Sequence, residues 1–513
     1  MNPQDDRMHS ALDETSAPSS LNPSREQILE MGCAAIQMIA DYYSALPQVT
    51  LAPNTTSAAV REQLALEFPV AGKDFDTLLE FINQKIFAAS RHNGHPRFFG
   101  YIASPGTAAT ALADLLASTL NPSLTSWRSA PGAAEIERQT IDWIKQIIGY
   151  APAAEGLFLS GGSMAHLCAL AVARDAKAPH PVTSQGCQTL ARAMRVYISA
   201  EGHHSISKAA GLLGIGRDNV RQVAVNSRFQ MDLRALAKLI EDDLAEGHLP
   251  FCVVANAGTV NTGACDALDE IAEVAAQYGL WFHVDACYGG FAALAPSKRV
   301  LFRGIERADS VALDPHKWLY VPGDCGCVLY RDPGRARATF GHEAEYIRVL
   351  ALASDEAFAF WDYGPELTRR FRALKVWMML AHVGAEALGE AIERNCQCAE
   401  YFAQLAAQAD DFEMLAPVEL SIFCFRYAPP ALKTAYAIAS GGERDAIDQK
   451  LNALNERILT AVQRGGSSYL SNAGIAGRFA LRGCVLNYRT TKRDMEILLD
   501  DVRQAGRQIV EEK

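Results

Sequence analysis

Apolar side chains recur at every third or fourth position along the first part of the chain. From 25 to 46 they fall on one face of a helix, with Ser24 placed as an N-cap and Pro47 just beyond the end. Similar spacing predicts further helices over 75–90 and 107–120. Residues 1–24 are instead rich in Ser, Pro, Asp and Asn, so we expect a disordered or loosely docked leader there.

Short apolar runs alternate with helical patterns between residues 157 and 332. The runs RVYIS, FCVVANAG, WFHVDAC, SVALD and GCVLYRD are typical of strands. They are apolar almost throughout, which is expected where helices cover both faces of a parallel or mixed sheet. Ligands in such sheets bind at the carboxyl ends of the strands. The residues that follow each run are therefore the candidates for chemistry.

The last part of the chain has a different pattern. A long helix is predicted over 367–393, and the remainder mixes helices with the short strands ELSIFCFRY and FALRGCVLNYR. We therefore expect an α/β protein in four parts: a leader at 1–24, a helical segment at 25–105, a large α/β domain at 106–390 and a small α+β domain at 391–513.

The composition is that of an ordinary globular protein, with 49% of its 513 residues hydrophobic and 21% charged. Its net charge of -11, from 48 basic and 59 acidic residues, gives no basis for binding nucleic acid or an anionic membrane. A small molecule is the expected ligand. The N-terminus has no signal-peptide pattern, and no apolar run approaches the roughly 20 residues of a membrane helix. We expect a cytoplasmic location.

Twelve cysteines are scattered along the chain. Cys325 and Cys327 form one C-x-C pair, and Cys396 and Cys398 form another, but neither has histidines nearby at ligand spacing. Without a secretion signal, reduced core thiols are the expected state. No metal site is predicted.

Two motifs could bind a phosphate and an aromatic ring. LSGGSMAHLCAL places the turn from Ser160 to Ser163 directly before a helix, where free backbone amides and the helix dipole favour a phosphate dianion. A plain Gly-Ser capping turn is the alternative. His203 follows the run RVYIS, where its imidazole could stack on a cofactor ring or could simply cap the next helix.

Two ionisable residues follow other apolar runs. Asp285 ends WFHVD, where a carboxylate could keep a pyridine nitrogen protonated, or could cap a helix or join a salt bridge. Lys317 lies three residues after the run SVALD and directly before Trp318. A lysine among apolar residues is expected to be buried, and burial should lower its pKa and give the free amine that a Schiff base requires. A surface lysine is the alternative. The order of the four motifs predicts a site for pyridoxal 5′-phosphate (PLP).

At these residues the chain resembles the PLP-dependent group II amino-acid decarboxylases of fold type I, which include the aromatic-L-amino-acid, glutamate and histidine decarboxylases. The shared segments are HPRFFGY, GGSMA, EGHHSISKA, NAGTVNTGACD, HVDACYGG, DPHKW and LRGCVLNYRTT. His316 before Lys317 discriminates best, because related aminotransferases usually have a small hydroxyl residue there. The resemblance implies a mixed, mostly parallel sheet covered by helices, and a homodimer whose active sites lie at the interface and whose N-terminal helices pack across the partner.

The resemblance also implies roles for single residues. Lys317 would form the Schiff base, Asp285 would pair with the pyridine nitrogen, and His203 would stack on the ring and act as a base. Asp314 departs from the family, whose members often have Asn, Thr or Ser near that position, and an acidic residue beside a phosphate is unexpected. The full set of expected cofactor-binding residues is Gly162, Ser163, His203, Thr259, Asp285, Cys287, Asp314, His316 and Lys317, with Cys287 in place of the usual alanine.

Tyr346, in HEAEYIRVL, matches a loop tyrosine that helps to return the proton in the family. Members with Phe there tend to be aldehyde synthases, so Tyr346 favours decarboxylation, although an ordinary amphipathic-helix tyrosine is the alternative. Tyr101, Ser104 and His203 are the expected substrate-binding residues. Tyr101 and Trp127 match the aromatic-specific members, whereas Ile102, Ser123 and Thr125 are smaller than usual and Asn93 replaces an aromatic residue.

We therefore predict a PLP-dependent L-amino-acid α-decarboxylase that releases CO2 and an amine, with an aromatic substrate of the tryptophan, tyrosine or DOPA type. One alternative is a decarboxylase of 2,4-diaminobutyrate, cysteine sulfinate, aspartate or glutamate. Another is an aldehyde synthase or aminotransferase. A third is a catalytically silent regulatory partner with a PLP fold. The presence of Lys317, Asp285, His203 and Tyr346 favours an enzyme.

Overall fold

The computed structural model describes residues 21–341 and 356–512, and the chain divides into one unit up to His92 and a second from Asn93 onward. The first unit is helical, as predicted. It contains α2 (Arg25–Ala45), α3 (Ser57–Gln63), α4 (Phe75–Phe81) and a π-helical turn, η1 (Ile82–Phe87). Ser24 and Gln27 form a capping box at the start of α2. None of these four helical segments has a buried residue.

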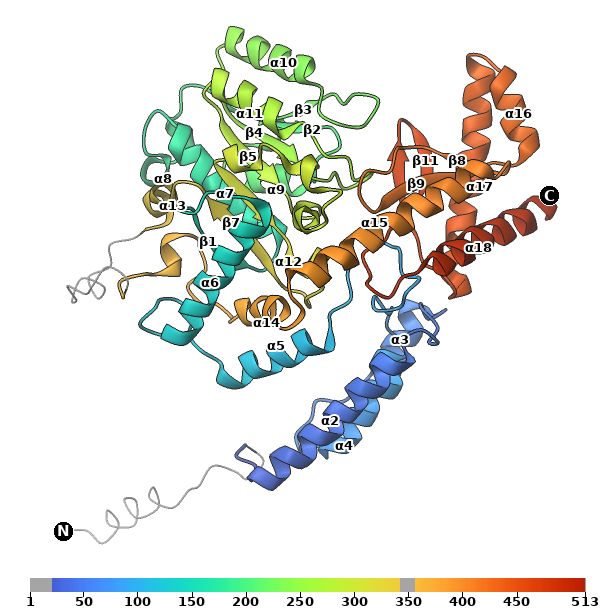
Figure 1. Cartoon of the computed structure of the whole chain (residues 1–513), viewed down its shortest axis with the longest axis horizontal. Coiled ribbons are helices and arrows are strands. Elements are labelled where there is room, and N and C mark those ends of the chain that lie inside the picture. Colours follow the sequence, from blue (N-terminus) through green and yellow to red (C-terminus); the bar gives the residue numbers. More distant parts are fainter. Residues whose placement is uncertain (1–20, 342–355, 513) are drawn as a thin grey trace. The chain divides into compact units, whose positions relative to one another are not determined.

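A seven-stranded sheet forms the centre of the second unit (Figure 1). Its strand order is β1-β7-β6-β5-β4-β2-β3, and β7 alone runs antiparallel to its neighbours. The sequence-based prediction of a mixed, mostly parallel sheet is confirmed. The strands are β1 (Glu155–Leu159), β2 (Met194–Ser199), β3 (Val220–Val223), β4 (Leu249–Asn256), β5 (Trp281–Asp285), β6 (Ser310–Leu313) and β7 (Gly326–Tyr330).

Helices cover this sheet, so its strands are buried almost throughout, except for the edge strand β3, in which only Val223 is buried. The apolar strand runs are thereby explained. The helices before β7 are α5 (Ala108–Leu120), α6 (Pro131–Ile148), α7 (Gly162–Lys177), α8 (Val182–Gln185), α9 (Ser205–Leu212), α10 (Leu233–Ala245), α11 (Leu268–Gln277) and α12 (Pro315–Trp318). Those after it include α13 (Pro333–Phe340), α14 (Ala373–Val383) and α15 (Ala385–Gln408).

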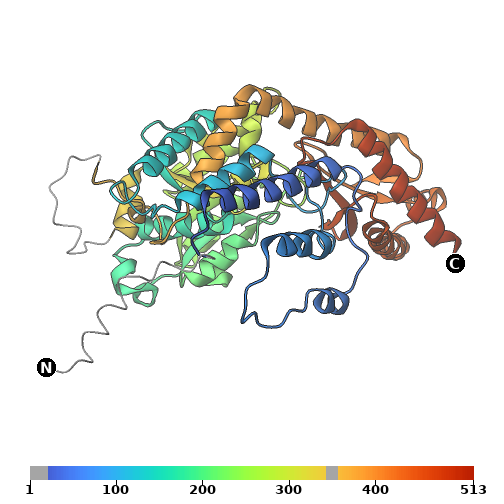
Figure 2. The ribbon, with the colours of Figure 1, turned by 90° about the horizontal axis from the view of Figure 1, so that it is seen from below.

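The single helix predicted over 367–393 is wrong. The chain forms α14 and α15 instead, with Gly384 between them at a φ of 84°. Glycine adopts this left-handed conformation without the steric cost that other residues pay. The break lets α15 run toward the C-terminal helix α18 (Lys492–Glu511), which Figure 2 shows from below.

A second, four-stranded antiparallel sheet lies in the C-terminal part, with the order β10-β11-β9-β8. Its strands are β8 (Phe412–Met414), β9 (Ile422–Tyr427), β10 (Ser471–Ile475) and β11 (Arg478–Cys484), and α16 (Pro430–Ile438) and α17 (Gly442–Gly465) join them. A separate hydrophobic core here includes Phe402, Phe423 and Phe425. These elements match the predicted α+β character, while the boundaries at 105 and 390 stay predictions.

Candidate active site

A cavity of about 390 Å3 opens at the carboxyl ends of the large sheet's strands. Ser160 follows β1, Asn256 ends β4, Asp285 ends β5 and Asp314 follows β6, so four separate strands deliver polar groups to one place. The lining also includes Gly161, Gly162, Ser163, Met164, His166, His203, Gly258, Cys287, His316 and Lys317. The four sequence motifs therefore converge.

The phosphate-type turn leads into α7 as expected. Gly161 is the N-cap of this helix and makes no side-chain capping bond, so the amides of the first turn are not occupied by a cap. A Cβ on Gly162 would lie 2.5 Å from Cys287 Sγ and 3.0 Å from Asp314 Oδ2. Glycine is therefore required at this position, because any side chain would collide with the cavity wall.

Asp285 is buried and remains ionised. Its Oδ1 accepts a hydrogen bond from the backbone N–H of Cys287 at 3.1 Å, and its Oδ2 lies 3.3 Å from His166 Nε2. Burial acts to raise the pKa of Asp285, but His166, Lys317 and the Cys287 amide outweigh it and hold that pKa below its ordinary range. A charged carboxylate of this kind suits a protonated ring nitrogen.

The expected low pKa of Lys317 is wrong. Burial does act to lower it, but Lys317 Nζ lies 2.9 Å from Asp314 Oδ2, and the carboxylates of Asp314 and Asp285 together raise the pKa above its ordinary value. The surface-lysine alternative is excluded, since Lys317 lines the cavity and its side chain is only 18% exposed. Lys317 is an ammonium ion held by Asp314.

The two oxygens of Asp314 have different surroundings. Oδ2 binds Lys317, whereas Oδ1 is buried and has no hydrogen bond within the described part of the chain. His316 Nδ1 lies 3.8 Å from Oδ1 but donates to the Cys325 carbonyl at 2.6 Å. Both oxygens lie beside Gly162, 3.0 and 3.4 Å from the position of a Cβ there.

His203 reaches the cavity from the loop before α9. Its Nδ1 accepts the backbone N–H of Ser205 at 3.3 Å and also lies 2.7 Å from the Ser205 hydroxyl. Burial lowers the pKa of His203 to about 4, so the ring is neutral at physiological pH. With Nδ1 accepting, the single ring proton is on Nε2.

The Cys287 side chain fills space in the cavity wall, and its Sγ lies 3.7 Å from His166 Nε2. Burial raises the pKa of its thiol well above the ordinary value, so it stays protonated and is a poor metal ligand, although His166 and Asp285 lie close by. Its Sγ instead occupies the space beside Gly162.

Three predicted residues are placed away from the cavity lining within the described part of the chain. Tyr101 is 54% exposed. The Thr259 hydroxyl bonds to Thr262 and to the Ala264 amide. Ser104 donates to the His316 carbonyl at 2.8 Å and so supports the segment that carries Lys317. Tyr346 lies outside the described residues.

His166, His283 and Asn256 were missed. His166 and Asn256 line the cavity, and His283 lies behind His166. A signal for His283 existed, because residues two apart on a strand share a face and His283 is two residues before Asp285. His166 has no such signal, since four residues into an apolar helix it resembles a core position.

Comparisons with known proteins place this fold and cavity in a family. A family model described as the pyridoxal-dependent decarboxylase conserved domain matches residues 58–428. The aromatic-L-amino-acid decarboxylase of Bacillus atrophaeus is 34% identical over 490 residues, covering 96% of this chain and 98% of that protein. The phenylacetaldehyde synthase of a Rosa hybrid cultivar is 30% identical over 469 residues, 90% of each chain. The crystal structure of Oryza sativa TDC with PLP and tryptamine matches with a TM-score of 0.87 at 26% identity, covering 96% of this chain and 100% of that one.

The fold and the cavity together define an enzyme of PLP fold type I. Because the matched region exceeds half of the chain and the relatives align along nearly all of it, the chain belongs to the pyridoxal-dependent decarboxylase family. Its cofactor is PLP.

The residues of the cavity fit this cofactor, with one exception. The uncapped start of α7 and the bare Gly162 suit a phosphate, Lys317 supplies an amine, and Asp285 supplies a charge for the pyridine nitrogen. Asp314 is the exception, because its carboxylate lies beside Gly162 and would repel a phosphate held at the start of α7.

Proposed function

We propose that this enzyme removes the α-carboxylate of an aromatic L-amino acid of the tryptophan, tyrosine or DOPA type. The bond between Cα and the carboxylate breaks, CO2 leaves, and one proton is added at Cα to give the amine. The convergence of Lys317, Asp285 and His203 on one cavity is the observation that carries this proposal. The similarity to the Bacillus atrophaeus aromatic-L-amino-acid decarboxylase along 96% of the chain supports the substrate class.

PLP, when bound, supplies the electron sink that accepts the electrons of the broken bond. Lys317 would hold the cofactor through its amine, and the start of α7 would hold the phosphate. Asp285 keeps a negative charge where the pyridine nitrogen would lie. His203 presents an uncharged imidazole with its proton on Nε2, which suits stacking on the ring and proton exchange with the substrate.

We also propose that the protein is a cytoplasmic homodimer with residues of both copies at each active site. Within the described residues, no helix combines the length and apolarity of a membrane span. On α5, Leu112, Leu115, Leu116 and Leu120 are all at least 40% exposed and share one face, which a second copy would cover. The opposite face of α5 packs on α14 through buried Ala113 and Ala117.

Product analysis tests the proposed reaction. The purified protein with PLP is incubated with L-tryptophan, L-tyrosine, L-DOPA and L-phenylalanine, and in parallel with 2,4-diaminobutyrate, cysteine sulfinate, aspartate and glutamate. We expect equal amounts of CO2 and amine from an aromatic substrate, and none from Lys317→Ala. Exclusive turnover of a small acidic or diamino substrate would overturn the proposed substrate class. If no tested amino acid releases CO2, the proposed decarboxylation itself is overturned.

Aldehyde formation is the second candidate reaction, because the 30% identical Rosa protein is a phenylacetaldehyde synthase. The same incubations separate the two reactions, since an aldehyde synthase consumes O2 and water and yields aldehyde, ammonia and hydrogen peroxide, with CO2, in place of amine. From the family pattern at Tyr346, we expect amine from the natural chain and a shift toward aldehyde in Tyr346→Phe. Aldehyde as the main product of the natural chain would replace the first proposal.

A further inference from the structure

A row of hydrogen-bonded side chains runs from Asp285 into the interior, away from the cavity. His166 Nε2 lies 3.3 Å from Asp285 Oδ2, and His166 Nδ1 lies 3.0 Å from His283 Nε2. His283 Nδ1 lies 2.8 Å from Ser310 Oγ, which also accepts a hydrogen bond from Trp281 Nε1 at 2.8 Å. The row crosses from α7 to β5 and β6.

Burial fixes the partners of this row. His283 and Ser310 are 0% exposed and His166 is 1% exposed, so their ring nitrogens and hydroxyl form their hydrogen bonds within the protein. The rings of His166 and His283 meet edge to face, with centroids 5.3 Å apart and planes at 89°. His166 therefore has its orientation set from behind, while its Nε2 faces Asp285.

The direction of the bond at Asp285 follows from the charge of its carboxylate. An ionised carboxylate can only accept, so His166 donates from Nε2 to Asp285 Oδ2, with Cys287 Sγ also 3.7 Å from that nitrogen. At the far end, His283 Nδ1 lies 2.8 Å from Ser310 Oγ and 3.2 Å from the Ser310 carbonyl oxygen. Between these ends, one hydrogen joins His166 Nδ1 and His283 Nε2.

His283 is neutral, because burial lowers its pKa to about 3. Its single hydrogen is either on Nε2, facing His166, or on Nδ1, facing the Ser310 carbonyl. In both arrangements His166 Nδ1 and His283 Nε2 are joined by one hydrogen bond, so His283 holds the His166 ring in place.

We propose that His166 and His283 are positioning residues, which hold Asp285 ionised and oriented toward the pyridine nitrogen of the cofactor. The inference rests on the proposed pairing of Asp285 with that nitrogen. Burial alone would favour a protonated, neutral carboxyl, and a neutral carboxyl would not keep the ring nitrogen protonated. The N–H of His166 counters this effect at Oδ2, as the Cys287 amide does at Oδ1.

The surroundings of Asp285 contain other titratable groups, and the test has to separate His166 from them. Asp314 is paired with Lys317, and the thiol of Cys287 is protonated. His166 alone among the neighbouring side chains has a nitrogen within 3.5 Å of the carboxylate in the described ion pairs. The groups that interact with Asp285 are His166 on α7, His203 before α9, Lys317 on α12, and His283 and Cys287 on or next to β5.

The test compares holoprotein variants by the visible absorbance of bound PLP from pH 6 to 9, and by the PLP dissociation constant from equilibrium dialysis. His166→Leu removes the donor at similar volume, and His166→Gln keeps an N–H at the end of the side chain. Asp285→Asn provides the reference for loss of the charge. We expect His166→Leu to raise the PLP dissociation constant about tenfold or more, because one hydrogen bond to a charged group is lost. Its spectrum should shift toward that of Asp285→Asn. His166→Gln should stay near the natural protein.

The outcomes separate this inference from the proposed site. An unchanged spectrum in Asp285→Asn would overturn the role of Asp285 itself. If the PLP spectrum changes in Asp285→Asn but not in His166→Leu, only the role of His166 is overturned. The same holds if the spectrum and PLP affinity of His166→Gln match those of His166→Leu. Should His166→Leu fail to fold, His283→Leu decides: it removes the ring that holds His166 from behind, and we expect a smaller shift in the same direction. An unchanged spectrum in His283→Leu would contradict the row.

Discussion

Asp314 has two neighbours with opposite requirements. Its carboxylate holds the Lys317 ammonium at 2.9 Å, and it also faces Gly162 at the start of α7, where a phosphate would lie. The first contact raises the pKa of Lys317, which disfavours the free amine that reacts with a carbonyl group. The second contact opposes a dianion. We therefore predict that Asp314 weakens cofactor binding, both through the pKa of Lys317 and through repulsion of the phosphate.

Asp314→Asn should bind PLP more tightly than the natural protein, by about 10- to 100-fold, because a carboxylate no longer faces the phosphate. Without Asp314, burial dominates at Lys317 and lowers its pKa, so more free amine is present near neutral pH. The pH at which PLP binding becomes fast should move downward. Stopped-flow absorbance after mixing apoprotein with PLP measures both effects.

The control for this change is Asp242→Asn on α10, where the carboxylate is 48% exposed and, among residues 21–341 and 356–512, pairs with Lys238 alone. It should leave both the affinity and the pH dependence unchanged. Weaker PLP binding in Asp314→Asn would show instead that the carboxylate contributes to holding the cofactor.

Residues at the boundary between a strand and a helix could be predicted from the sequence. Asp285, Lys317 and Gly162 each interrupt a long apolar pattern, so the sequence indicates that they are candidates for a functional role. The predicted lowering of the Lys317 pKa is wrong because it considers burial alone. Asp314 stands three residues earlier, close enough within one helical turn to pair with the lysine. His166 could not be predicted because its significance lies in contacts with β5, which only the folded chain brings together.

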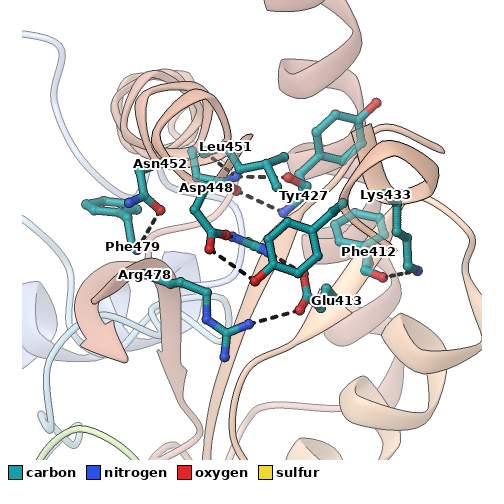
Figure 3. Close-up of polar contacts among 12 residues, drawn as sticks. Phe412, Glu413, Tyr427, Lys433, Asp448, Leu451, Asn452, Arg478 and Phe479 are labelled. Carbon is teal, nitrogen blue, oxygen red and sulfur yellow. Dashed lines mark hydrogen bonds and ion pairs between the residues drawn. The ribbon is translucent and has the colours of Figure 1, made fainter. Parts of the chain in front are cut away.

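At the scale of single elements, the small C-terminal sheet is held by a buried cation. Arg426 on β9 is fully buried, and it binds Glu413 on β8 at 2.7 Å and Asp448 on α17 at 2.6 Å. Both carboxylates have a further partner. Figure 3 shows Arg478 of β11 directed at Glu413, a contact of 3.1 Å, and Asp448 also accepts from Tyr436 at 3.1 Å. One guanidinium thus links two strands and a helix.

Arg426→Met should lower the free energy of unfolding by about 2–4 kcal/mol, because it leaves Glu413 and Asp448 without their buried counter-ion. Arg478→Met is the matched control: it removes a guanidinium that contacts the same Glu413 but is 26% exposed, so it should cost under about 1 kcal/mol. Urea unfolding followed by circular dichroism measures both. Equal losses in the two variants would contradict the importance of burial here.

At the scale of the whole molecule, several surfaces are too apolar for an isolated chain. The helices of the unit up to His92 have no buried residue, although α2 includes Ile28, Leu29 and Ile36, each at least 40% exposed. Apolar faces of this size are expected to be covered in solution. The leucine face of α5 shows the same feature in the second unit. Both observations favour an assembly of two copies.

Leu116→Glu tests whether the leucine face of α5 is such an interface. Leu116 is 55% exposed, so a charge there costs little in a single chain, whereas burying that charge between two copies costs several kcal/mol. We expect light scattering to show a dimer for the natural protein and a monomer for Leu116→Glu. Leu244→Glu on α10, where Leu244 is 45% exposed, is the matched control and should remain a dimer.

If both copies contribute to each active site, the monomer should also lose decarboxylation while its circular dichroism stays unchanged. A Leu116→Glu protein that stays dimeric would exclude α5 from the interface, and a fully active monomer would overturn the shared active site.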